Sequence, residues 1–216
     1  MPIAEHAVAL YEARLPTDAR PRTALEAAQR FALGGRRGQE LRTTGWAAHK
    51  ASSHSPDLAL KSAARAASLT AAVAYMHLDL IDANQLKHLY GPVVYTAQAL
   101  ELAADGSSEI GDQVIVDALS SATDSVTTLA RSMPALSPAK TRLSHLYAAL
   151  DAGLREGRGT DTTVTAEAAS NEGLFLLMRR GVDELYTALL DDLLTELRTA
   201  TAPPTTHERL TPDSPS

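Results

Sequence analysis

Side chains that could bind or transform a ligand are concentrated between residues 46 and 95. Arg65 lies inside an alanine-rich segment, where burying a charge without a partner is costly. His88 and Tyr95 are seven residues apart, so they share one face of a helix. Pro92 lies between them and predicts a kink, because it offers no N–H to the preceding turn. Imidazole groups titrate near neutral pH. Together these features predict a polar pocket beside a bent helix.

The predicted pocket draws its residues from several expected helices. The candidate ligand-binding residues are Arg20, Trp46, His49, Arg65, His77, Gln85, Lys87, His88 and Tyr95. If the chain is an enzyme, His77 and His88 are the candidates for a general acid or base. The alternative interpretation is that Arg65 and the histidines are satisfied groups in the core or at its rim.

Several familiar kinds of catalytic site have no counterpart in the sequence. The chain has no cysteine, which excludes disulfides, thiolate catalysis and cysteine-bound zinc. No two histidines have the i, i+4 spacing of a helical zinc site, and no Glu-x-x-His pair suits a di-iron bundle. No serine lies in a G-x-S-x-G turn, and the glycines at 34–38 lack the Lys-Ser or Lys-Thr of a phosphate loop. We therefore expect neither a metal nor another cofactor.

Helical periodicity predicts an all-α fold, an up-and-down bundle of seven or eight helices. The segment 56–76 is apolar or small on nearly every side, which is typical of the central helix of a bundle. Asp82 followed by Gln85 predicts a capping box for the next helix. The expected helices are 2–14, 21–33, 37–53, 56–76, 83–103, 109–131, 138–155 and 166–199.

The predicted domain organisation is a helical bundle over 1–157, a linker over 158–165, a C-terminal amphipathic helix over 166–200 and a disordered tail over 201–216. The helix carries leucines and other apolar residues at spacings of three and four. An apolar stripe of this length needs a partner surface. Two arrangements are open, in which this helix packs on its own bundle or mediates a homodimer.

Composition limits the cellular locations and the binding partners that we expect for this chain. A net charge of −6 argues against non-specific nucleic-acid binding, which needs clustered cations. The first residues lack the basic and apolar regions of a signal peptide. No apolar run reaches the roughly 18 residues of a membrane helix. We expect a cytoplasmic protein that binds neither nucleic acid nor membrane.

Four stretches carry a resemblance to a known family. They are DARPRTALEAAQRFA (18–32), GWAAHKAS (45–52), SAARAASLTAAVAYMH (62–77) and NQLKHLYGPVVYTAQALELA (84–103). The distinctive members are Arg20-Pro21-Arg22, Trp46, His49, Arg65, His77 and Lys87-His88. Over roughly residues 10–155 the chain resembles bacterial immunity proteins with an immunity-protein-five-like helical domain. The resemblance implies a compact helical domain that binds and neutralises a toxin.

The leading functional hypothesis is a non-enzymatic binding protein of immunity or resistance type that sequesters a toxin or a small molecule. One alternative is a cofactor-free helical enzyme of specialised metabolism, with a histidine as general acid or base. Another is a structural protein whose last helix mediates assembly.

Overall fold

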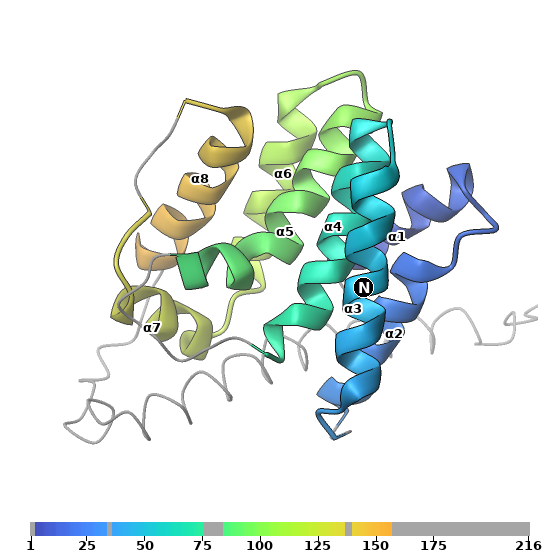
Figure 1. The fold of residues 1–216 in the computed structure, drawn as a ribbon. Coiled ribbons are helices and arrows are strands. Elements are labelled where there is room, and N and C mark those ends of the chain that lie inside the picture. The colour runs from blue at the N-terminus through green and yellow to red at the C-terminus, as the bar shows by residue number, and fades with distance from the viewer. Residues whose placement is uncertain (1–2, 34–35, 76–83, 137–139, 157–216) are drawn as a thin grey trace, which may run out of the picture.

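The computed structural model describes residues 3–33, 36–75, 84–136 and 140–156. This part of the chain contains eight helices and no strand, which confirms the predicted all-α bundle. Figure 1 shows the helices packed side by side, with the short α7 at one end. The elements are α1 (Ile3–Arg14), α2 (Arg20–Ala32), α3 (Gln39–His54), α4 (Leu58–Val73), α5 (Asn84–Ala103), α6 (Ser108–Ser120), α7 (Asp124–Ser132) and α8 (Arg142–Glu156).

The alanine-rich helix α4 lies at the centre of one half of the bundle, as predicted. It packs against α1, α2, α3 and α5, and most of its residues are buried. Alanines on several sides of α4 are completely buried, because small side chains let neighbouring helices approach closely. The Asp57 carboxylate begins α4 by accepting the N–H groups of Ala59 at 2.8 Å and Leu60 at 3.2 Å.

Helix α5 ends at Ala103, as predicted, and continues through Gly91 and Pro92. Figure 1 shows α5 changing direction along its length. Gly91 is buried against α4, where an added Cβ would overlap the side chain of Leu69. Glycine at position 91 therefore allows close packing of α4 and α5 at this point.

The prediction of one helix over 109–131 is wrong, because α6 ends at Ser120 and α7 begins at Asp124. The hydroxyls of Ser120 and Ser121 donate to the carbonyl of Asp117, at 2.7 and 3.1 Å. Such local bonds offer the backbone an alternative to the helix. Thr123 then adopts extended backbone angles and starts the next helix. The serines at this position indicate the break between α6 and α7, but a prediction from apolar periodicity alone does not detect it.

Several predictions fall outside the described residues. They concern the capping residue Asp82, the linker 158–165, the helix 166–200 and the tail 201–216. Within the described ranges, no helix is long and apolar enough to cross a membrane.

Candidate functional site

Helices α3, α4 and α5 bring together four of the predicted site residues, Trp46, His49, Arg65 and Tyr95, which we call the Trp46 cluster. The rings of Trp46 and His49 have centroids 5.1 Å apart. The guanidinium of Arg65 donates from Nη1 to Nδ1 of His49 at 2.5 Å. Its carbon lies 6.0 Å from the centroid of the Tyr95 ring. The side chain of Arg65 on α4 thus contacts residues of both neighbouring helices, α3 and α5.

Helix register and close packing explain this meeting. Trp46 and His49 are three residues apart on α3 and therefore neighbours on its surface. Gly45 lies against α4, and a Cβ added there would be 3.1 Å from that of Ala71. The short distance between α3 and α4 lets Arg65 reach across to His49. Tyr147 of α8 extends the cluster, since its ring packs edge-on to Tyr95 at 6.4 Å.

The cluster lies at the edge of the core, with its aromatic end in solvent. Trp46 is 60% exposed, whereas His49, Arg65 and Tyr95 are half-buried. Ala64 and Ala66, beside Arg65 on α4, are completely buried. The charge of Arg65 is therefore held where the apolar core meets the surface. It has structural partners, and part of it remains accessible.

The electrostatics of the cluster favour a neutral imidazole. Burial, and secondly the positive charge of Arg65, lowers the pKa of His49 below its ordinary value. Because Arg65 can only donate, Nδ1 of His49 must accept, which places the imidazole proton on Nε2. His49 therefore presents a hydrogen-bond acceptor to Arg65 and a donor on its other nitrogen.

This arrangement predicts a pH-dependent stability that depends on His49. Because the pKa is lower in the folded chain, the unfolded chain binds the proton more readily, and stability rises with pH in this range. The contribution is complete above the unfolded value of about 6.5 and is lost as the pH falls through the folded pKa. We expect His49→Gln to reduce the fall in unfolding free energy between about pH 7.5 and about pH 5.5, measured by urea titration. An unchanged pH dependence would contradict the prediction, and His54→Gln, at an exposed position on the same helix, is the control.

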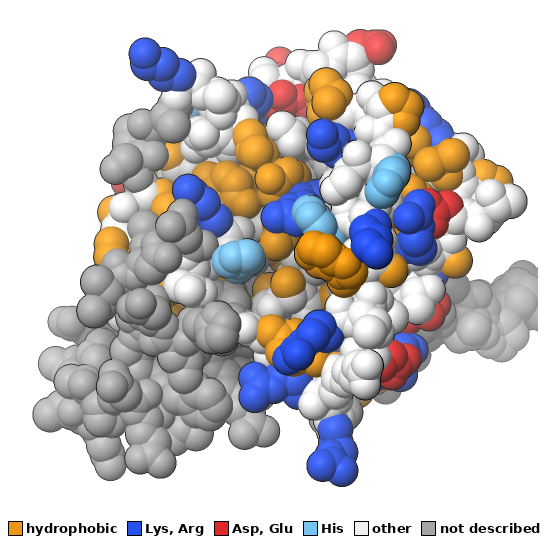
Figure 2. All heavy atoms as spheres, viewed as in Figure 1, with side chains coloured by type: hydrophobic (Ala, Val, Ile, Leu, Met, Phe, Trp, Pro, Cys, Tyr) orange, Lys and Arg blue, Asp and Glu red, His pale blue; other side chains and the backbone are white. Residues whose placement is uncertain are grey.

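The other predicted residues on α5 lie near its start. Gln85 is half-buried, and Lys87 and His88 are exposed. The backbone carbonyl of Lys87 accepts the hydroxyl of Tyr147 at 3.1 Å, which links this turn to the cluster. Figure 2 shows Lys, Arg and His side chains gathered around hydrophobic ones on this face. His77 lies outside the described residues.

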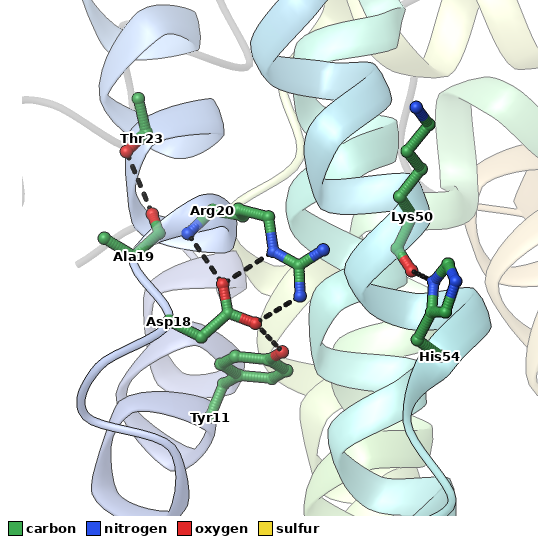
Figure 3. Close-up of polar contacts among 7 residues, drawn as sticks. All are labelled: Tyr11, Asp18, Ala19, Arg20, Thr23, Lys50 and His54. Carbon is green, nitrogen blue, oxygen red and sulfur yellow. Dashed lines mark hydrogen bonds and ion pairs between the residues drawn. The ribbon is translucent and has the colours of Figure 1, made fainter.

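Arg20 has a different setting, at the connection between α1 and α2. Its guanidinium contacts both carboxylate oxygens of Asp18, at 2.7 and 2.6 Å, and Asp18 also accepts the hydroxyl of Tyr11 at 2.7 Å (Figure 3). The bonds from Arg20 hold the pKa of Asp18 well below its usual range. Burial, followed by the nearby carboxylate, raises the pKa of Tyr11 to about 12. These contacts brace the α1–α2 corner, and the structure does not bring Arg20 into the Trp46 cluster.

Sequence reasoning missed Asp151 of α8, the most deeply buried charged group among the described residues. Asp151 is 2% exposed. It accepts from the Tyr90 hydroxyl at 2.9 Å, the Leu136 amide at 2.9 Å and Nε of Arg155 at 3.0 Å. Asp151 is four residues after Tyr147 and three before Leu154, so its spacing places it beside the apolar stripe of α8, a signal that the sequence analysis did not use. Only its partners from distant segments reveal a structural role.

Among the described residues, no group of three His, Asp or Glu side chains is arranged to hold a metal ion.

These observations define a helical bundle that displays an aromatic and cationic cluster at its surface. A family model described as Imm-5 like putative immunity protein matches residues 1–120. The match covers more than half of the chain, and the chain belongs to this family. It includes α1 to α6 and the whole Trp46 cluster. No curated protein and no solved structure matches the chain. The expected resemblance is confirmed, and family membership supports an immunity-type role.

Proposed function

We propose that this protein neutralises a toxin by binding it stoichiometrically, without catalysis, through a surface centred on the Trp46 cluster. Family membership supplies the immunity-type role. The more specific proposal of sequestration rests on the exposed aromatic and cationic side chains of the Trp46 cluster. The same mechanism is the leading hypothesis from the sequence.

The observation that carries the proposal is the exposure of Trp46. It is the only tryptophan of the chain, and 60% of its surface is open to solvent. Tryptophan is usually well buried, and tryptophan and arginine are enriched among residues that dominate binding energy at protein interfaces. Contact with His49 limits the motion of the Trp46 ring. A partner that covers it therefore gains apolar burial at a small entropic cost.

A protein partner suits this surface better than a small molecule. Small-molecule sites enclose most of the ligand surface within a concavity. Trp46 instead presents a broad apolar face to the outside, which a second protein surface can cover. Arg65 and the donor nitrogen of His49 lie beside it and supply polar contacts that fix the orientation of the partner.

The test distinguishes sequestration from an enzymatic role by stoichiometry. The products of the genes that neighbour the gene for this chain are screened for toxicity, and a toxic product is assayed with increasing amounts of the full-length protein. Sequestration predicts a linear loss of toxin activity that ends at a one-to-one molar ratio. Complete loss at a small fraction of that ratio would indicate catalysis and overturn the proposal.

Replacing Trp46 with alanine is the sharpest variant for this test. We expect the dissociation constant of the toxin complex to rise about 30-fold, or about 2 kcal/mol, because Trp46 supplies the central apolar contact. The change is measured by isothermal titration calorimetry. The control is Val116→Ala on α6, which also truncates an exposed apolar side chain, 56% exposed. Equal losses of affinity in the two variants would contradict a role for Trp46 at the centre of the interface.

A further inference from the structure

We infer that the face formed by α3, α4 and α5 binds an acidic protein surface, with a partner carboxylate paired to Arg65. This inference deepens the proposed function and rests on it, because it states the chemistry of the partner. It is carried by two independent observations, the distribution of charge along three helices and the nature of the groups that contact Arg65.

The first observation is the absence of acidic residues from three adjoining segments. Residues 41–56, 58–75 and 84–100 contain no aspartate or glutamate. The same segments carry five lysines or arginines, Arg42, Lys50, Lys61, Arg65 and Lys87. The chain as a whole has a net charge of −6. These three segments therefore carry a net positive charge, although the chain as a whole carries a net negative charge.

The three segments form one continuous part of the bundle. Helix α3 packs against α4, and α4 packs against α5. Figure 2 shows this face with Lys, Arg and His side chains across its middle and Asp and Glu side chains toward its margins. Among the described residues, the acids that flank these segments are engaged, since Glu40 pairs with Arg30, Asp57 with Arg14 and Glu101 with Arg142. A positive potential here attracts an oppositely charged partner.

The second observation is that the partners of Arg65 within the described residues are neutral. The Arg65 guanidinium donates to the imidazole of His49 and lies over the ring of Tyr95. By contrast, Arg22 and Arg142 each pair with two carboxylates. A half-buried guanidinium gains most from a carboxylate, which accepts two parallel N–H groups. The exposed ring of Trp46 adjoins this group and can exclude water from such a pair.

The pattern favours a protein carboxylate over a nucleic-acid phosphate. Nucleic-acid binding requires a dense row of cations that replaces condensed counterions. Here five cations are spread over three helices, one of which also carries an exposed tryptophan, within an acidic chain. A few separated charges around an apolar centre are typical of a protein interface.

The emission of Trp46 provides the direct test, because no other tryptophan contributes. Poly-L-glutamate is added to the full chain at low ionic strength. We expect a saturable change in the emission, weakened by added salt. Oligothymidylate is the comparison polyanion and is expected to bind more weakly. Tighter binding of oligothymidylate, or no saturable change with poly-L-glutamate, would overturn the inference.

Two variants that lose the same charge isolate Arg65. Arg65→Met is expected to weaken poly-L-glutamate binding about tenfold. Arg30→Met removes an exposed arginine that is paired with Glu40, and is expected to change binding less than about twofold. Arg65→Lys retains the charge and is expected to bind between wild type and Arg65→Met. Circular dichroism verifies that each variant is folded. Equal effects of Arg65→Met and Arg30→Met would overturn the assignment.

The inference and the proposed function can fail separately. If toxin activity ends at a one-to-one ratio but Arg65→Met binds the toxin as tightly as wild type, sequestration holds and the acidic contact is wrong. If toxin activity has no such end point while poly-L-glutamate binding depends on Arg65, the face is an acid-binding surface and sequestration is wrong.

Discussion

Replacing Asp151 with alanine is expected to lower the free energy of unfolding by about 4 kcal/mol. The variant leaves the buried hydroxyl of Tyr90, the amide of Leu136 and the guanidinium of Arg155 without their acceptor. Each unsatisfied donor costs about 1–3 kcal/mol, and the stranded charge costs more. The loss is measured by urea denaturation followed by circular dichroism.

The effect should depend on burial and not on loss of an aspartate as such. Asp117 is exposed and accepts a side-chain bond from Gln113 at 2.7 Å, one turn away. Asp117→Ala is expected to change stability by less than about 0.5 kcal/mol. Removing only one donor, by Tyr90→Phe, should cost about 1–2 kcal/mol. A result for Asp151→Ala within about 1 kcal/mol of wild type would show that the three donors find other acceptors.

Enlarging Gly91 to leucine is expected to destabilise the chain by about 3 kcal/mol. A Cβ at this position would overlap the side chain of Leu69, and the rest of a leucine would force α4 and α5 apart. Interiors are close-packed, so the helices must separate or distort to admit the added atoms. The loss is measured by the same denaturation experiment. Leucine at the exposed position Ala149 on α8 is the control and should leave stability nearly unchanged.

The Gly91 variant should also disturb the Trp46 cluster. Arg65 is one helical turn before Leu69 on α4, and Tyr95 is one turn after Gly91 on α5. Separating the helices at Gly91 therefore moves Arg65 away from the Tyr95 ring. We expect Gly91→Leu to weaken poly-L-glutamate binding along with stability. Gly91→Ala adds a single methyl group, which the flexible end of Leu69 can accommodate, and should change stability by less than about 1 kcal/mol. Equal stability of wild type and Gly91→Leu would rule out a tight contact at this crossing.

The cluster combines a structural and a proposed binding role in the same groups. His49 and Tyr95 hold Arg65 in place, while Trp46 extends the cluster into solvent. A preorganised cation and a supported aromatic ring reduce the entropy lost when a partner binds.

The sequence alone was sufficient for the fold class, the central position of α4 and the end of α5. These properties follow from apolar periodicity and from the sizes of neighbouring side chains, which are local features. The sequence alone was not sufficient to predict the break between α6 and α7. At this break, serine hydroxyls bond to the backbone within a segment whose apolar pattern continues.

Only the tertiary structure decided which polar groups meet. It joined Arg65 to His49 and Tyr95, placed Arg20 with Asp18, and surrounded Asp151 with donors from two other parts of the chain. These pairings depend on the distance and rotation between helices, which are set by close contacts such as that of Gly91 with Leu69. Helical periodicity specifies which side of a helix faces inward, but not which turn of the neighbouring helix lies opposite.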